Sequence, residues 1–181
     1  MTPTTPVPVG STRALADRTT ALLNALAEDT VDAARITSLF TEHGEITPDL
    51  TEDDVRALRE VAGELRHVLA ADSLDEAVTR VNALLAREAH PPRLANHGGT
   101  HGWHLHVDCD DEAPWDEWFA ASTGLFLARL ISERQRRPGG VCAAHGCDRV
   151  FVETAHGGVQ RYCSRRCATR ARVAAHRRTH S

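Results

Sequence analysis

Apolar side chains recur every three or four positions through the first ninety residues, which is the spacing of amphipathic helices. The pattern predicts four helices. The first covers about 11–29 and the second 31–41, the third begins at Thr51 and carries apolar residues to Leu69, and the fourth begins at Ser73. Pro91 and Pro92 end the fourth helix, because proline cannot continue the helical hydrogen-bond pattern.

The pattern then changes to a period of two. Residues 103–109 alternate between apolar and polar side chains, as in a strand, and we expect this strand to pair with 93–95 across the Gly98–Gly99 turn. A long helix follows at 115–137, with Pro114 at its start, and Pro138–Gly139–Gly140 ends it and forms a short hinge. The expected fold class of this body is mostly α with a small β element, that is, α+β.

After the hinge the pattern predicts a small separate module. Residues 149–154 form a strand, 156–158 a turn, 159–162 a return strand and 164–178 a helix. Four cysteines frame these elements, with the spacing Cys-x4-Cys, then 15 residues, then Cys-x3-Cys. Two such pairs can place four thiolates tetrahedrally around one Zn²⁺.

We therefore predict one structural zinc ion in a treble-clef-like finger made of a knuckle, a β-hairpin and a helix. The alternatives are four unrelated buried thiols, or His145 in place of one cysteine. The chain then divides into a disordered tail at 1–10, a body at 11–137 and the finger at 138–181. The predicted metal ligands are Cys142, Cys147, Cys163 and Cys167.

The net charge of the chain also changes sign close to the boundary between body and finger. The net charge is −4, but residues 133–181 carry eleven arginines and three acidic residues, a net of +8, and residues 1–132 carry −12. The final helix has one face of small residues, Ala168, Ala171 and Ala175, and a broad outer face of arginines. Such a face can neutralise phosphates or contact guanine edges, and its alternative is a solvated helix with surplus charge. The predicted nucleic-acid contacts are Arg161, Arg165, Arg166, Arg170, Arg172 and Arg177.

The segment CAAHGCDRVFVET followed by RYCSRRCATRARVAAHRR resembles the zinc finger of the CGNR family. In this chain the Cys-Gly-Asn-Arg motif is Cys167–Ala168–Thr169–Arg170, so its cysteine and arginine match and its two middle residues differ. The body, with its segment PRLANHGGTHGWHLHVD, resembles the ABATE domain that precedes such fingers. The resemblance implies a bacterial stress-induced transcription regulator whose finger binds DNA.

A second cluster of candidate ligands lies in the body, where His97, His101, His104 and His106 fall within ten residues. In the predicted strand, His104, His106 and Asp108 share one face and can bind a second metal ion or a small anion. The alternative is a half-exposed strand whose buried face consists of Trp103, Leu105, Val107 and Cys109.

Two function classes remain open. The first is a transcription regulator that binds double-stranded DNA, with the body available for forming a homodimer. The alternative is a protein-interaction module in which the basic finger docks on an acidic partner or on the acidic body.

We expect no enzymatic activity, because four cysteines leave zinc no open coordination position. The N-terminus lacks a secretory signal and no apolar run is long enough for a membrane span, so we expect a cytoplasmic protein.

Overall fold

The computed structural model describes residues 11–45, 48–99, 102–154 and 159–179. The predicted N-terminal tail at 1–10 and the turn at 156–158 lie outside the described residues. Helices predominate, with two short antiparallel strand pairs, so the predicted fold class is confirmed.

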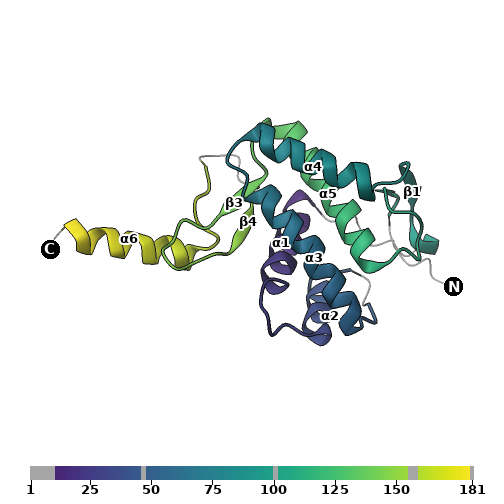
Figure 1. Ribbon diagram of the computed structural model, residues 1–181, viewed down its shortest axis with the longest axis horizontal. Helices are drawn as coiled ribbons and strands as arrows, with labels where there is room; N and C mark the ends of the chain where they lie inside the picture. The colour runs from purple at the N-terminus through teal and green to yellow at the C-terminus, as the bar shows by residue number, and fades with distance from the viewer. Residues whose placement is uncertain (1–10, 46–47, 100–101, 155–158, 180–181) are drawn as a thin grey trace.

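Five helices form the body (Figure 1). They are α1 (Thr12–Ala25), α2 (Ala33–Glu42), α3 (Glu52–Leu69), α4 (Leu74–Glu88) and α5 (Trp115–Arg134). The first four each begin at a side chain that accepts a hydrogen bond from a backbone N–H three residues further on, which satisfies a donor that the helix leaves unpaired. These capping residues are Ser11, Asp32, Thr51 and Ser73.

The core lies around α3, which packs against α1, α2, α4 and α5. Leu58, Leu65 and Leu69 on α3 are completely buried, with Phe119 and Leu127 of α5. The long helix predicted at 115–137 ends earlier, at Arg134, because Gln135 adopts a left-handed conformation with φ of 52°.

The strands β1 (Arg93–Ala95) and β2 (His104–His106) pair antiparallel, as predicted, with Leu94 opposite Leu105. The alternative of a buried face made of Trp103, Leu105, Val107 and Cys109 holds for Val107 alone, which is buried. Trp103 is 69% exposed, and Leu105 and Cys109 are also exposed, whereas His106 and Asp108 are buried. The hairpin turns its polar face inward because the histidines and carboxylates bond to one another there.

The predicted hinge is instead a strand. Gly139–Val141 forms β3, which pairs antiparallel with β4 (Val150–Val152), and residues 159–162 form no strand. A Cβ atom placed on Gly139 would lie only 2.0 Å from the backbone oxygen of Phe151, so this pairing requires glycine at position 139. The predicted partner of β4 was therefore wrong.

The β3–β4 pair is joined to the body rather than separated from it. Val150 and Val152 belong to the same buried cluster as the helices. The Asn24 side chain on α1 donates to the carbonyl of Val150 and accepts from its N–H, both at 2.9 Å. The Arg66 guanidinium on α3 donates to the Asp148 carbonyl at 2.8 Å. The body thus provides a rigid base for the cysteine knuckle that follows β3.

The last helix, α6 (Arg165–Thr179), projects away from the body as an arm (Figure 1). Its bounds agree with the predicted 164–178. Within the described part of the chain, no helix is both long enough and apolar enough to cross a bilayer.

Candidate metal centre and nucleic-acid interface

The structure brings the four predicted cysteine ligands together. Their sulfur atoms all lie within 4.8 Å of one another. The Sγ atoms of Cys147, Cys163 and Cys167 form a triangle with sides of 3.8, 3.7 and 3.8 Å. A tetrahedral zinc ion with Zn–S bonds of about 2.3 Å requires S–S separations of about 3.8 Å. The donor set therefore fits one zinc ion.

Local backbone geometry positions each ligand pair. Cys142 directly follows β3, and its N–H donates to the Arg149 carbonyl at 2.9 Å. The Cys147 N–H closes a turn onto the Ala144 carbonyl at 3.0 Å, which Gly146 permits through its left-handed φ of 68°. These contacts form the predicted knuckle.

The second pair opens α6. The Cys167 N–H donates to the Ser164 hydroxyl at 3.2 Å, so Ser164 caps the helix at the metal site. Cys167 therefore lies in the first turn of α6, where the helix dipole stabilises a thiolate. The position of α6 is thus tied to the sulfur cluster.

The electrostatics of the cluster favour a cation at its centre. Burial acts to raise the pKa of Cys142, but hydrogen bonds from the backbone of Cys163 and Ala144 and from neighbouring thiols outweigh it, lowering the pKa to about 7. Burial and hydrogen bonding to the other thiols raise the pKa of Cys163 to about 12. Thiols this close cannot all ionise unless a positive ion offsets their mutual repulsion.

His145 does not replace a cysteine, since it is exposed and is not a member of the sulfur cluster. The four cysteines close the coordination shell, which is the arrangement of a structural rather than a catalytic zinc ion.

Every predicted nucleic-acid contact has an exposed side chain. These residues are Arg161, Arg165, Arg166, Arg170, Arg172 and Arg177. On the opposite side of α6, Ala168 and Ala171 are partly buried, as predicted. Ala175 is exposed, and Ala174 is the third partly buried alanine. The Arg170 guanidinium also lies 3.7 Å from the Cys167 sulfur, which links the arginine face to the metal centre.

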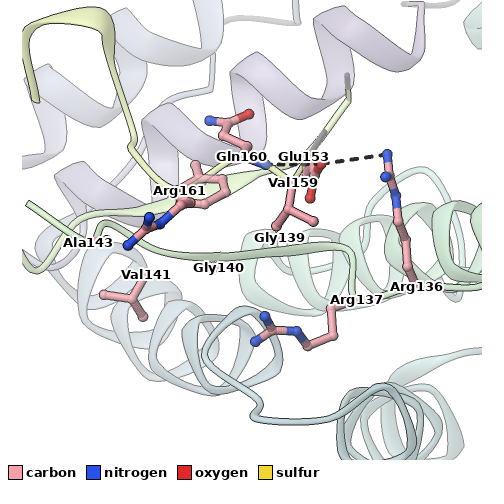
Figure 2. Close-up of a pocket in the computed structure, with 11 residues that line it drawn as sticks. Arg136, Arg137, Gly139, Gly140, Val141, Ala143, Glu153, Val159, Gln160 and Arg161 are labelled. Atoms are coloured by element: carbon pink, nitrogen blue, oxygen red, sulfur yellow. Dashed lines mark hydrogen bonds and ion pairs between the residues drawn. The ribbon is translucent and has the colours of Figure 1, made fainter. Parts of the chain in front are cut away.

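Three arginines surround a cavity of about 260 Å³ beside β3, as Figure 2 shows. Arg161 is one of them, and sequence reasoning did not assign a role to the other two. Arg136 forms an ion pair with the buried Glu153 at 3.6 Å, and Arg137 donates to the Ala71 carbonyl at 2.7 Å. These two arginines hold the strand pair to the body, and their partners were not visible in the local sequence.

The second predicted ligand group is arranged differently from expectation. His104 and His106 do lie together, but the third imidazole beside them belongs to His97. Asp108 hydrogen-bonds to Nδ1 of His106 and so lies behind that ring. His101 lies outside the described residues.

The structure thus defines a small four-cysteine zinc finger whose second ligand pair opens a basic helix. Residues 140–180 match the family model of the CGNR zinc finger. The match does not include residues 11–137, so the ABATE resemblance of the body stays a prediction. A search of curated proteins found no match for the chain.

Proposed function

We propose that this protein is a DNA-binding transcription regulator that contacts duplex DNA through α6. One observation carries the proposal: a helix with exposed arginines along its length projects from the body and is anchored at its first turn to the metal centre. The width of a major groove admits one α-helix, and arginine donates to both phosphates and guanine edges.

The distribution of charge supports the same surface. Residues 133–181 have a net charge of +8, whereas residues 1–132 have −12. A polyanion attracts the first and repels the second, so the protein would approach DNA with α6 leading.

Zinc has a structural role in this proposal. It holds Cys163 and Cys167 beside the knuckle, and thereby fixes the direction in which α6 leaves the body. Few apolar residues are buried around the cysteines, so metal binding supplies much of the free energy that orders this segment. Removal of zinc should therefore abolish DNA binding even though every arginine side chain is still present, because α6 is no longer held in place.

The proposal is tested by titrating fluorescent duplex DNA with the full-length protein at several salt concentrations. We expect affinity to fall steeply with salt and to disappear when a chelator removes zinc. The double variant Arg166→Gln/Arg170→Gln should bind more weakly and lower the slope of log K against log salt by roughly one per lost phosphate contact.

The matched control is Arg13→Gln/Arg56→Gln, which removes two exposed arginines of the body. This variant lowers the net charge by the same amount, so we expect nearly unchanged binding. Equal losses for the two double variants would mean that net charge alone drives binding, and α6 would not be the contact surface.

The opposite charges of body and finger favour one alternative, docking of α6 on an acidic protein surface. Poly-glutamate of the same total charge as the duplex distinguishes the two partners. Preference for the duplex supports a nucleic-acid partner, whereas preference for poly-glutamate supports the interaction module.

A single helix makes few DNA contacts, so we propose that two copies of the chain act together. Sedimentation of protein with duplex should show two chains per DNA when the body forms a homodimer. We assign no catalytic role to the finger's zinc ion, because its four ligand positions are taken by cysteine.

A further inference from the structure

We propose that His97, His104 and His106 bind a second, divalent transition-metal ion in the helical body, separate from the zinc finger. Of the described residues, these three and the four cysteines of the finger form the two groups able to hold a metal ion. The site does not depend on the proposed DNA-binding function.

The three imidazoles converge through the same ring nitrogen. Nε2 of His104 lies 3.3 Å from Nε2 of His97 and 2.8 Å from Nε2 of His106, and the three rings each offer a nitrogen within 4.8 Å of the others. A tetrahedral ion with metal–nitrogen bonds of about 2.0–2.1 Å requires nitrogen separations of about 3.4 Å. The separation between His104 and His97 already matches, and a small rotation of the His106 ring would widen its separation from His104.

The hydrogen bonds behind two of the rings determine which nitrogen carries the proton. Nδ1 of His104 lies 2.8 Å from the Gly102 carbonyl, which can only accept, so this nitrogen donates. Nδ1 of His106 lies 2.9 Å from the Asp108 carboxylate, which also accepts from Arg93, so it donates as well. In neutral rings, both Nε2 atoms therefore direct lone pairs toward each other across 2.8 Å.

A cation must offset the repulsion between these lone pairs. A proton can bridge two nitrogens, but a metal ion can coordinate three at once. The position of His97, whose Nε2 adjoins that of His104, favours the metal ion. Neutral imidazoles are common ligands of zinc, copper, iron and nickel, which defines the class of ion.

Carboxylates lie behind two of the ligands, as they do in protein metal sites generally. Asp108 is bonded to Nδ1 of His106, and Asp111 lies 3.5 Å from Nδ1 of His97. Arg93 on β1 contacts both carboxylates at 2.8 Å, and its hydrogen bond, against an opposing effect of burial, lowers the pKa of Asp111. One arginine thus orders the carboxylates that support two histidines.

The backbone also brings His97 to the other two. His97 begins the 3₁₀ turn η1 (His97–Gly99) with a left-handed φ of 48°, which is costly for a residue other than glycine. Such conformations persist where the surrounding structure holds them, and they concentrate at functional sites. Here the unusual φ places an imidazole over β2.

All three imidazoles line a cavity of about 560 Å³ between the hairpin, α1, α2 and α5. Its ionisable lining, apart from histidine, has more acidic than basic groups: Glu45, Asp108, Asp110, Asp111 and Glu112 against Arg18 and Arg129. Arg18 is paired with Glu45, so the surroundings attract a cation rather than an anion. Three protein ligands leave at least one position for water or a small ligand from the cavity.

The test measures the metal content of the full-length protein after loading with Zn²⁺ at neutral pH and removal of unbound ion. We expect two ions per chain in the wild type and one in His104→Gln. The matched control is His67→Gln, which alters an exposed histidine on α3 outside the cluster and should retain two. Circular dichroism would check that each variant is folded.

A second variant keeps the proposal testable if His104→Gln does not fold. Asp108→Asn preserves size but removes the carboxylate behind His106, so we expect the Kd for the second ion to rise about 10- to 100-fold. Titration calorimetry on protein whose finger is already loaded with zinc measures this Kd. The proposal is overturned if the wild type takes up no second ion, or if His104→Gln and wild type bind two ions equally.

Discussion

At the scale of single residues, two side chains determine how the finger is joined to the body. Asn24 lies on α1 but satisfies both backbone groups of Val150, 126 positions away. Gly139 has no side chain, and this absence lets the Phe151 backbone approach β3. The glycine thus permits the pairing of β3 with β4, and the buried amide attaches β4 to α1.

The substitution Gly139→Ala should be strongly destabilising, by about 3 kcal/mol or more, because the new Cβ would overlap the Phe151 carbonyl and the Leu69 side chain. Urea unfolding of the two proteins measures the difference. The control is Gly63→Ala on α3, where a Cβ meets nothing within 4 Å, so a gain of about 0.5–1 kcal/mol is expected. Equal stability of Gly139→Ala and wild type would contradict the β3–β4 pairing.

At the scale of elements, the helices begin where local side chains satisfy their first backbone donors. In α3, the Thr51 hydroxyl accepts from the Asp54 N–H at 3.2 Å, and the Asp54 carboxylate accepts from the Thr51 N–H at 2.8 Å. This reciprocal pair is a capping box, and it sets the start of the central helix.

The substitution Thr51→Ala should cost about 1 kcal/mol of the free energy of unfolding near neutral pH, because it removes this cap. Hydrogen bonds from the Thr51 side chain and backbone lower the pKa of Asp54 below its usual value of 3.8. The stabilisation is therefore complete above the usual pKa of aspartate and is lost as pH falls through the lowered one. The difference in the free energy of unfolding between Thr51→Ala and wild type should therefore shrink as pH falls through that range.

Urea unfolding at a series of pH values measures both effects. The control is Thr79→Ala on α4, whose exposed hydroxyl bonds only to the Asp75 carbonyl within the helix, so no loss of stability is expected. A pH-independent effect of Thr51→Ala would show that the Asp54 carboxylate contributes nothing to the cap.

At the scale of the whole molecule, the break in composition near residue 138 is not a break in the packing. The strand β4 is completely buried, and it contacts both α1 and α3. In contrast, α6 extends away from the body (Figure 1). The first part of the finger therefore completes the body's core, and the last part presents the basic surface.

Two truncations test this division. Residues 1–137 lack β3 and β4, and loss of Val150 and Val152, each worth about 1.5–3 kcal/mol when buried, should lower Tm by roughly 10 °C or more. Residues 1–154 retain both strands and should melt closer to the full chain. Thermal unfolding followed by circular dichroism measures both, and equal Tm values would show that the strands do not stabilise the body.

The sequence by itself determined the features that depend on neighbouring residues. Helix starts followed from capping side chains such as Thr51, and the four zinc ligands followed from the spacing of the cysteines. The pairing of β1 with β2 followed from a short turn. Each of these signals acts over a few residues or a single short loop, so it is present in the order of the amino acids.

Only the tertiary structure decided which partner β4 takes, which face of the β1–β2 hairpin is buried, and that His97 rather than Asp108 completes the histidine cluster. Alternation shows that a strand has two different faces, but burial depends on what packs against each face. Arg93 and Asp108 make the polar face the inner one, Asn24 attaches β4 to α1, and Gly139 lets β3 pair with β4. The Asn24 contact joins residues 126 positions apart, and the other contacts depend on how two strands meet, so no local pattern specifies them.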